Sequence, residues 1–144
     1  MRRVNRSALM PYSARQMFDI VNDVPAYPEF LPWCHSSEVL SQDEQGIVAR
    51  LQLAKSGLKH SFTTRNIISV PGSIEMELVE GPFSKLSGRW TFVQLGEDGC
   101  RITMDLQFDF NSRLFNLTLA GVFEIAADKM VDAFCERADR LYNS

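Results

Sequence analysis

Hydrophobic and polar residues alternate along much of the chain. The clearest stretch is CRITMDLQFDF, residues 100–110, in which every second residue is apolar and the residues between them are polar or charged. Residues 47–54 and 74–79 keep the same two-residue period. Because successive side chains of a strand point to opposite faces of a sheet, this spacing predicts strands with one buried face and one face in water.

Turn-forming residues separate the predicted strands. They are Ser56-Gly57, Pro71-Gly72, Gly81-Pro82 and the segment 96–99. Such residues favour tight reversals of the chain, and short connections make neighbouring strands antiparallel. We therefore expect an opening strand over residues 4–10 and six further antiparallel strands between residues 36 and 110.

A short helix is predicted directly after the opening strand. Ser13 can cap a helix over residues 14–23, with Gln16 reaching back to complete a capping box. Three prolines between residues 25 and 32 then prevent this helix from continuing, because proline cannot donate the backbone hydrogen bond that a helix interior needs.

A long amphipathic helix is predicted at the end of the chain. Apolar residues recur there at three- and four-residue spacing from Phe115 to Leu141, and charged residues occupy the other side. A sheet with one apolar face and a helix with one apolar stripe can bury both surfaces against each other. No repeat or linker interrupts the chain, so we predict one α+β domain over residues 1–144, with an antiparallel sheet of about seven strands packed on the long helix.

Composition narrows the functional classes. The chain has 144 residues, 45% of them hydrophobic, with a net charge of −3 and a sequence pI near 5.4. A chain with net negative charge is not typical of general nucleic-acid binders, whose affinity for phosphate comes from Lys and Arg, so no DNA partner is expected. The basic start lacks the apolar stretch of a signal peptide, and no apolar run approaches the ~18 residues that span a bilayer, so we expect a cytoplasmic protein.

The sequence shows no catalytic or metal-binding pattern. Its three cysteines and two histidines are widely spaced, which fits neither a disulfide framework nor a known set of metal ligands. In the most regular strands the ionisable residues, among them Glu75, Arg101 and Asp105, fall on the face opposite the apolar one. These positions do not bring a nucleophile, an acid and a base into one pocket, so we expect no enzyme, no cyclase or hydrolase activity and no required cofactor.

Four segments resemble a known protein family. They are VNDVPAYPEFLPWC (residues 21–34), FTTRN (62–66), EGPFSKLSGRWTF (80–92) and VFEIAADKMVDAFCERADRLY (122–142). Together with the predicted order of elements, they resemble the START-like, polyketide-cyclase-like superfamily, and within it the family of RatA-type ribosome-association toxins and coenzyme-Q-binding proteins. The resemblance implies a helix-grip fold, in which a curved antiparallel sheet wraps a long C-terminal helix.

The resemblance implies two functions, and the sequence does not choose between them. The first is a non-enzymatic binding protein that holds a hydrophobic small molecule, ubiquinone-like or another lipid, in a cavity between the sheet and the C-terminal helix. Its contact with the inner membrane would be peripheral at most. The alternative is a toxin-type translation inhibitor that binds the large ribosomal subunit and blocks its association with the small subunit.

The ligand hypothesis rests on large or adaptable side chains that should meet between sheet and helix. The predicted cavity residues are Tyr27, Phe30, Trp33, Phe62, Met76, Leu78, Phe83, Trp90, Phe92, Met104, Leu106, Phe108, Val122, Ala126, Met130 and Phe134. The proline-rich segment 23–34 is expected to cap the cavity mouth, because proline lowers the entropy lost on ordering, and Gly81-Pro82-Phe83 is expected to form a second flap. The alternative is that these side chains simply fill the core.

The ribosome hypothesis rests on basic side chains. The candidate contacts are Lys55, Lys59 and Arg65 around the second predicted hairpin, together with the arginines at the start of the chain. The alternative is ordinary solvated charge, because the outer face of the sheet also carries acidic residues. The FTTRN segment belongs to the resemblance, and the sequence assigns it no role.

Overall fold

The elements follow the predicted order. The structure is a computed structural model, and it describes residues 2–55, 58–69, 72–110 and 117–143. The elements are strand β1 (Arg2–Met10), helix α1 (Ala14–Asn22), the 3₁₀ helix η1 (Val24–Glu29), strands β2 (Cys34–Gln42), β3 (Gly46–Lys55), β4 (Leu58–Ser69), β5 (Ser73–Glu80), β6 (Phe83–Leu95) and β7 (Gly99–Phe110), and helix α2 (Leu117–Tyr142). The predicted turn at Ser56-Gly57, together with Pro71 and Phe115, lies outside the described residues.

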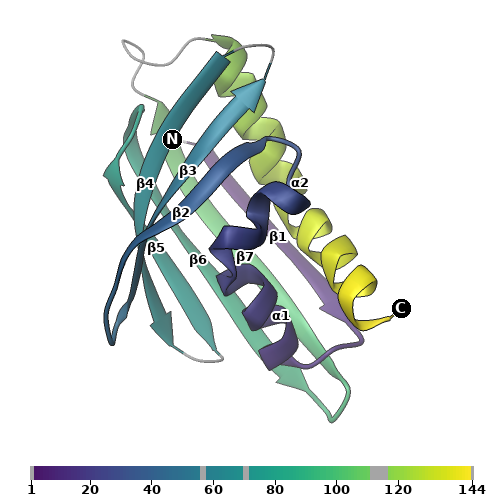
Figure 1. The fold of residues 1–144 in the computed structure, drawn as a ribbon. Coiled ribbons are helices and arrows are strands. Elements are labelled where there is room, and N and C mark those ends of the chain that lie inside the picture. Colours follow the sequence, from purple (N-terminus) through teal and green to yellow (C-terminus); the bar gives the residue numbers. More distant parts are fainter. Residues whose placement is uncertain (1, 56–57, 70–71, 111–116, 144) are drawn as a thin grey trace.

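All seven strands form one antiparallel sheet. Their order across the sheet is β1-β7-β6-β5-β4-β3-β2, so the first two strands of the chain form its two edges. Figure 1 shows the sheet curving around α2, which packs against β1, β3 and β7. The predicted helix-grip fold of the α+β class is confirmed.

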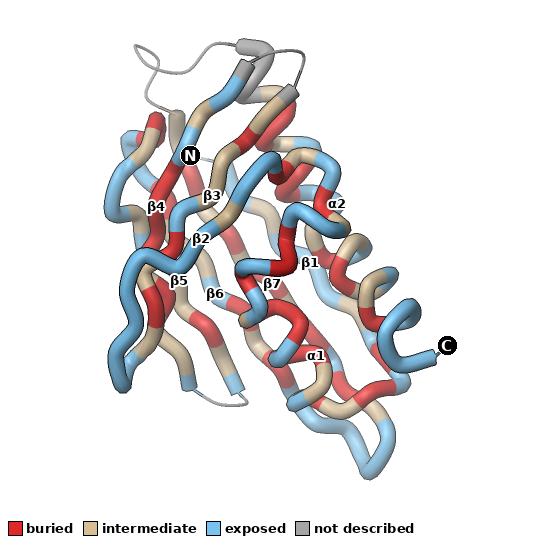
Figure 2. The backbone as a smooth tube through the Cα atoms, viewed as in Figure 1, coloured by how far each residue is buried: buried red, intermediate tan, exposed pale blue. Residues whose placement is uncertain are grey.

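The apolar face of the sheet is buried against α2. Along β7 every second residue from Cys100 to Phe108 is buried, which is the alternation that the sequence predicts. Phe134 and Ala138 of α2 are fully buried on the opposite side of this core. Figure 2 shows buried positions recurring along the strands and along the side of α2 that faces them.

Helix α1 begins at the predicted capping box. The Gln16 backbone N–H donates to Ser13 Oγ at 3.0 Å, and the Ser13 backbone N–H donates to Gln16 Oε1 at 2.9 Å. These two bonds satisfy backbone donors that the first turn of a helix otherwise leaves unpaired. The helix buries Met17, Ile20 and Val21, and it ends before the prolines as predicted.

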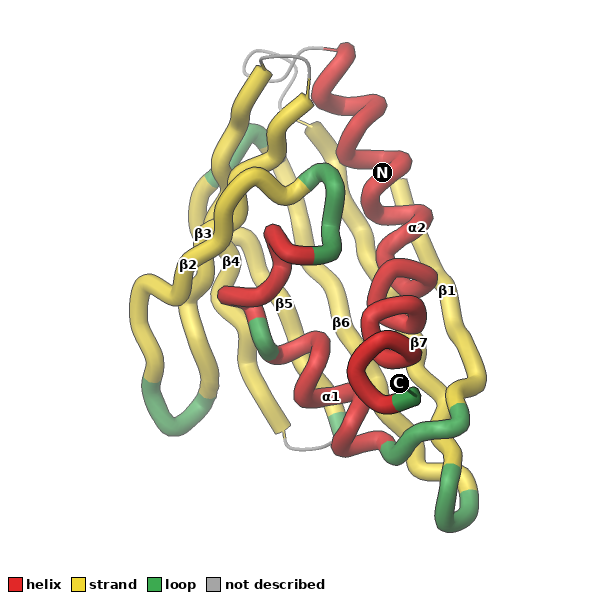
Figure 3. The backbone as a smooth tube through the Cα atoms, turned by 45° about the vertical axis from the view of Figure 1, so that its right-hand side comes forward, coloured by secondary structure: helices red, strands yellow, loops and turns green. Residues whose placement is uncertain are grey.

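The proline-rich segment fills the space between β2 and α2. The 3₁₀ helix η1 contains Pro28, and the hydroxyl of Ser37 on β2 donates to the backbone carbonyl of Val24 at 2.7 Å. On the other side, the ring of Tyr27 lies edge-on to Phe134 of α2, with centroids 5.4 Å apart. Figure 3 shows η1 and α1 bridging the opening that the curved sheet leaves beside α2.

Candidate ligand-binding site between the sheet and the C-terminal helix

Two hollows lie next to each other under the proline-rich segment. An inner cavity of about 70 Å³ lies between the sheet and α2, and an outer groove of about 580 Å³ runs between α2 and the residues that follow η1. Trp33 and Ala126 line both of them. Small-molecule pockets usually measure ~300–1,000 Å³, so the groove reaches that range and the inner cavity does not.

Most of the predicted cavity residues come together around the inner cavity. Those that line it are Tyr27, Trp33, Phe62, Met76, Trp90, Met104, Leu106, Ala126, Met130 and Phe134. Two more, Phe30 and Val122, line the outer groove instead. The fold therefore places aromatic and methionine side chains from η1, four strands and α2 around one space.

Four predicted cavity residues lie in neither hollow as the described residues define them: Leu78, Phe83, Phe92 and Phe108. The ring of Phe92 packs edge-on against Phe18 of α1, with centroids 5.6 Å apart, and the ring of Phe108 packs against Phe123 of α2 at 4.9 Å. The apolar face of the curved sheet is longer than the cavity, and helix side chains fill its ends. Alternation predicts which face a residue occupies, but not its position along that face.

The predicted flap at Gly81-Pro82-Phe83 is part of the core. Pro82 and Phe83 are buried, and the Phe83 ring lies 5.7 Å from Phe62 and 4.8 Å from Phe123, measured between centroids. Because several rings enclose Phe83, this residue supports the end of the cavity and is not placed as a loop-borne cover.

Two polar residues that the sequence analysis does not predict as cavity residues also line the inner cavity. Thr64 and Asn66 of the FTTRN segment are 6% and 9% exposed, and the Thr64 hydroxyl donates to Asn66 Oδ1 at 2.9 Å. They occupy alternate positions of β4, as does Phe62, so all three share the inner face. The sequence signal for this placement is the two-residue spacing of Phe62, Thr64 and Asn66 within FTTRN, which puts them on one face of the strand.

The inner cavity has an uncharged wall. Among the described residues that line it, only Tyr27 is titratable in water, and its hydroxyl donates to the backbone carbonyl of Val21. Burial raises the pKa of Tyr27 far above neutrality, so the phenol stays protonated. Beneath η1, burial likewise raises the pKa of the Cys34 thiol to about 11. The described part of the wall therefore offers hydrogen bonds and apolar contact, and no group that exchanges protons near pH 7.

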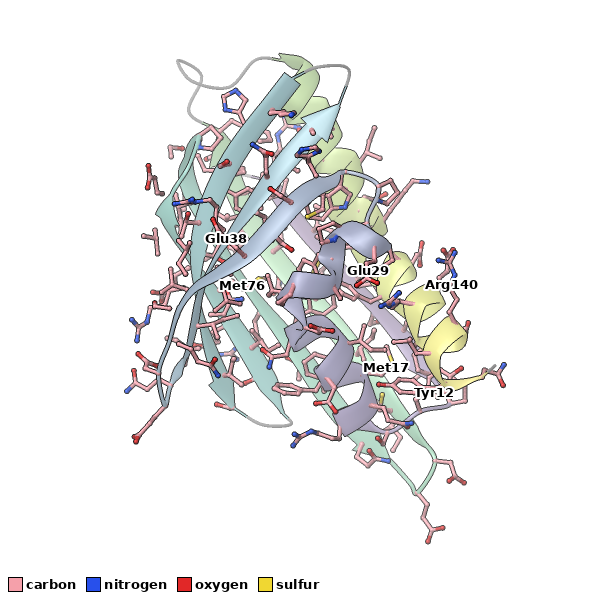
Figure 4. All side chains as sticks on the ribbon, viewed as in Figure 1. Tyr12, Met17, Glu29, Glu38, Met76 and Arg140 are labelled. Atoms are coloured by element: carbon pink, nitrogen blue, oxygen red, sulfur yellow. The ribbon has the colours of Figure 1, made fainter. Side chains whose placement is uncertain are left out.

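The outer groove combines apolar walls with a charged rim. Phe30, Trp33 and Ile125 contribute apolar surface, and the rim carries Lys129, Asp132, Glu136 and Arg140. The guanidinium of Arg137 lies 5.0 Å from the centroid of the Phe30 ring and 3.9 Å from a carboxylate oxygen of Glu29. Figure 4 shows Glu29 and Arg140 at the side of the molecule where η1 and α2 meet.

Two of the predicted ribosome contacts, Lys59 and Arg65, lie on the outer face of the sheet. Lys59 is exposed on β4, whereas Arg65 is half-buried, 3.8 Å from Asp43 Oδ2 and donating to Gln45 Oε1 at 3.2 Å. The side chain of Lys55 lies outside the described part of the structure. Other arginines on this face also meet carboxylates, including Arg50 with Glu38 and Arg89 with Glu75. This face is therefore close to charge balance.

Neither a membrane span nor a metal centre is found within the described ranges. No helix there combines the length and the apolar character needed to cross a bilayer. Three or more metal-ligating side chains do not gather at any point of the same residues.

Sequence comparisons place the chain among characterised relatives. A family model described as polyketide cyclase/dehydrase and lipid transport matches residues 10–135. The ribosome association toxin RatA of Pseudomonas aeruginosa is 53% identical over 139 residues, which cover 96% of each chain. The mitochondrial coenzyme Q-binding protein COQ10 of Dictyostelium discoideum is 27% identical over 94% of this chain and 68% of its own length.

Solved structures share the same fold. A START superfamily protein from Mycobacterium smegmatis superimposes with a TM-score of 0.80 at 22% identity, covering 96% of this chain and 98% of its own. An aromatase/cyclase from a Streptomyces species gives the same TM-score at 19% identity, covering 96% and 94%. The chain therefore belongs to the START-like family described as polyketide cyclase/dehydrase and lipid transport, and within it is similar along almost its whole length to the ribosome association toxin RatA.

Proposed function

We propose that this protein associates with the ribosome and acts there by binding, without catalysing a reaction. The supporting observation is the 53% identity to the ribosome association toxin RatA over 96% of both chains. Further relatives of that name, from Vibrio cholerae and Escherichia coli, are 44% and 43% identical over nearly all of this chain. Following the family resemblance, the target is the large subunit, and the consequence is a block of subunit association.

Sucrose-gradient sedimentation tests this proposal. Lysate that contains the tagged protein is centrifuged at moderate and at high salt, and the protein is followed relative to the ribosomal subunits. We expect it to migrate with the large subunit at moderate salt, while free subunits accumulate at the expense of intact ribosomes. Recovery only at the top of the gradient at moderate salt would contradict ribosome association.

Charge reversal on β4 tests where the ribosome is contacted. The double substitution Lys59→Glu with Arg65→Glu should remove the protein from the large-subunit fraction, because it turns attraction to rRNA phosphates into repulsion. The matched control is Lys85→Glu with Arg101→Glu, which makes the same charge change at exposed positions of β6 and β7. If the β4 variant still migrates with the large subunit as the control does, this part of β4 is excluded as the contact. Far-UV circular dichroism verifies that each variant is folded.

A second proposed function is the binding of a hydrophobic small molecule. It is supported by the groove of about 580 Å³ with apolar walls, which adjoins the inner cavity at Trp33 and Ala126. Extraction of the purified protein with organic solvent, followed by mass spectrometry, should recover a lipid-like compound in stoichiometric amount. A protein that carries no such compound and takes up none of the hydrophobic probes described below would not be a lipid carrier.

A further inference from the structure

The FTTRN segment places a polar pair in a wall that is otherwise largely apolar. Thr64 and Asn66 face the inner cavity, while their neighbour Thr63 lines a depression on the outer face of the sheet with His60 and Glu80. The described cavity residues around the pair are aliphatic, aromatic or methionine side chains. A threonine and an asparagine are an unusual choice for such a wall, because polar groups lose hydration when they are buried.

The amide N–H groups of Asn66 remain available to donate a hydrogen bond to a ligand. The Thr64 hydroxyl donates to Asn66 Oδ1 at 2.9 Å, so this bond uses the amide oxygen. Within the described part of the chain, no side chain or backbone oxygen accepts from Asn66 Nδ2. Among the described residues no fully buried side-chain nitrogen or oxygen lacks a partner, so Nδ2 keeps accessible surface, and its place in the wall directs that surface to the cavity. An acceptor inside the cavity would complete the hydrogen bonds of this amide.

We propose that the Asn66 amide, oriented by Thr64, donates a hydrogen bond to an uncharged acceptor oxygen on the head of a bound hydrophobic molecule. This inference rests on the second proposed function, ligand binding, and it assigns the residues that contact the head group. The described cavity wall has no cationic side chain, so a carboxylate or phosphate head would enter without a counter-charge at high cost. A carbonyl oxygen of a quinone, ketone or ester fits both the donor and the neutral wall.

The dimensions indicate how such a molecule would lie. The inner cavity of about 70 Å³ is smaller than the ~150 Å³ of an engineered cavity that binds benzene, so a ring must enlarge it. Met76 and Met130 are half-buried in its wall and can change conformation readily; Figure 4 shows Met76 on the sheet. The apolar tail would pass Trp33 and occupy the outer groove.

The test compares probes that differ only in the head group. Decylubiquinone offers neutral carbonyl oxygens, decylbenzene offers none, and decanoate is an anion with a similar tail. Equilibrium dialysis against the full-length protein, read by extraction and mass spectrometry, gives the three affinities. We expect decylubiquinone to bind at least about tenfold more tightly than either other probe, because the apolar probe leaves the amide donor unpaired and the anion lacks a counter-charge.

Variants attribute this preference to the polar pair. Asn66→Leu should bring the affinities for decylubiquinone and decylbenzene within about threefold of each other, since the donor is gone. Thr64→Val should weaken the preference, whereas Thr63→Val, the same change on the outer face, should keep it. Circular dichroism melting verifies folding, and Asn66→Val, which likewise has no donor and no charge, replaces Asn66→Leu if that variant does not fold.

The possible outcomes separate the two proposals. Equal affinity of the wild-type protein for decylubiquinone and decylbenzene, or tightest binding of decanoate, would overturn the role of Asn66 and leave ligand binding intact. A preference that survives in a folded Asn66 variant without a donor would overturn it as well. Binding of none of the three probes would instead refute the ligand-binding function itself.

Discussion

Tyr27 is the residue that fastens the proline-rich segment to the rest of the molecule. Its hydroxyl donates to the backbone carbonyl of Val21, and its ring packs edge-on against Phe30 and Phe134, with centroids 6.1 and 5.4 Å away. The prolines around it restrict the backbone, so a few side-chain contacts are sufficient to hold the segment over the cavity.

Removing this hydroxyl should weaken the fold measurably. Tyr27→Phe leaves the ring in place but deprives a buried carbonyl of its donor, so we expect a loss of about 1 kcal/mol in the free energy of unfolding. Urea denaturation followed by circular dichroism measures it. The control is Tyr142→Phe, whose exposed hydroxyl donates to the backbone carbonyl of Gln16 at 3.0 Å and should matter less. A loss at Tyr27 no larger than that at Tyr142 would mean that the Tyr27 hydroxyl does not anchor the segment.

At the scale of elements, the edge strand β1 is held to β7 by more than its backbone ladder. Arg3 Nε donates to Asp105 Oδ1 at 3.0 Å, and Arg3 Nη2 donates to Asp105 Oδ2 at 2.8 Å. The two residues thus form a bidentate ion pair on the outer face. The hydrogen bond from Arg3 lowers the pKa of Asp105. The folded state therefore favours the ionised carboxylate.

This pair predicts a small acid-dependent stability difference. Because the pKa of Asp105 is lower in the folded than in the unfolded chain, its contribution is present above about pH 4 and is lost as the pH falls through the folded value. Asp105→Asn should thus lower the urea midpoint slightly at pH 7, while the two proteins become alike near pH 2. A difference that stays constant over this range would show that the ion pair is not its cause.

The elements were more predictable than the site. Alternation located the buried face of β7, and Ser13 with Gln16 located the start of α1, because both signals are local. The cavity depends on which residues of distant elements meet, so Phe92 and Phe108 were assigned to it although α1 and α2 fill their surroundings. Asn66 was overlooked because a polar residue on an apolar face becomes informative only when its buried partner, Thr64, is known.

At the scale of the whole molecule, the inner cavity and the outer groove adjoin each other at Trp33 and Ala126. A ligand that occupies both would join β4, η1 and α2, elements that are far apart in sequence. Binding to the folded state alone raises stability by mass action, independently of which contacts the ligand makes.

Ligand binding should therefore raise the melting temperature. At a free decylubiquinone concentration of 100 times its dissociation constant, the gain is about 2.7 kcal/mol, which corresponds to roughly 5–10 °C for a chain of this size. Scanning calorimetry with and without the probe measures the shift, and decanoate at the same concentration is the control. An unchanged melting temperature at saturating probe would mean that the probe does not bind the folded state in preference to the unfolded chain.

The position of Trp33 also allows ligand entry to be followed by intrinsic tryptophan fluorescence. The chain has two tryptophans: Trp90 is 3% exposed in the wall of the inner cavity, and Trp33 is half-buried where cavity and groove meet. Their indoles should emit at different wavelengths, the drier Trp90 further to the blue. A molecule held only in the groove would alter the red part of the emission, and one that reaches Asn66 would alter both parts. Fluorescence spectra of Trp33→Phe and Trp90→Phe would then report, without any label, how deeply a ligand has entered.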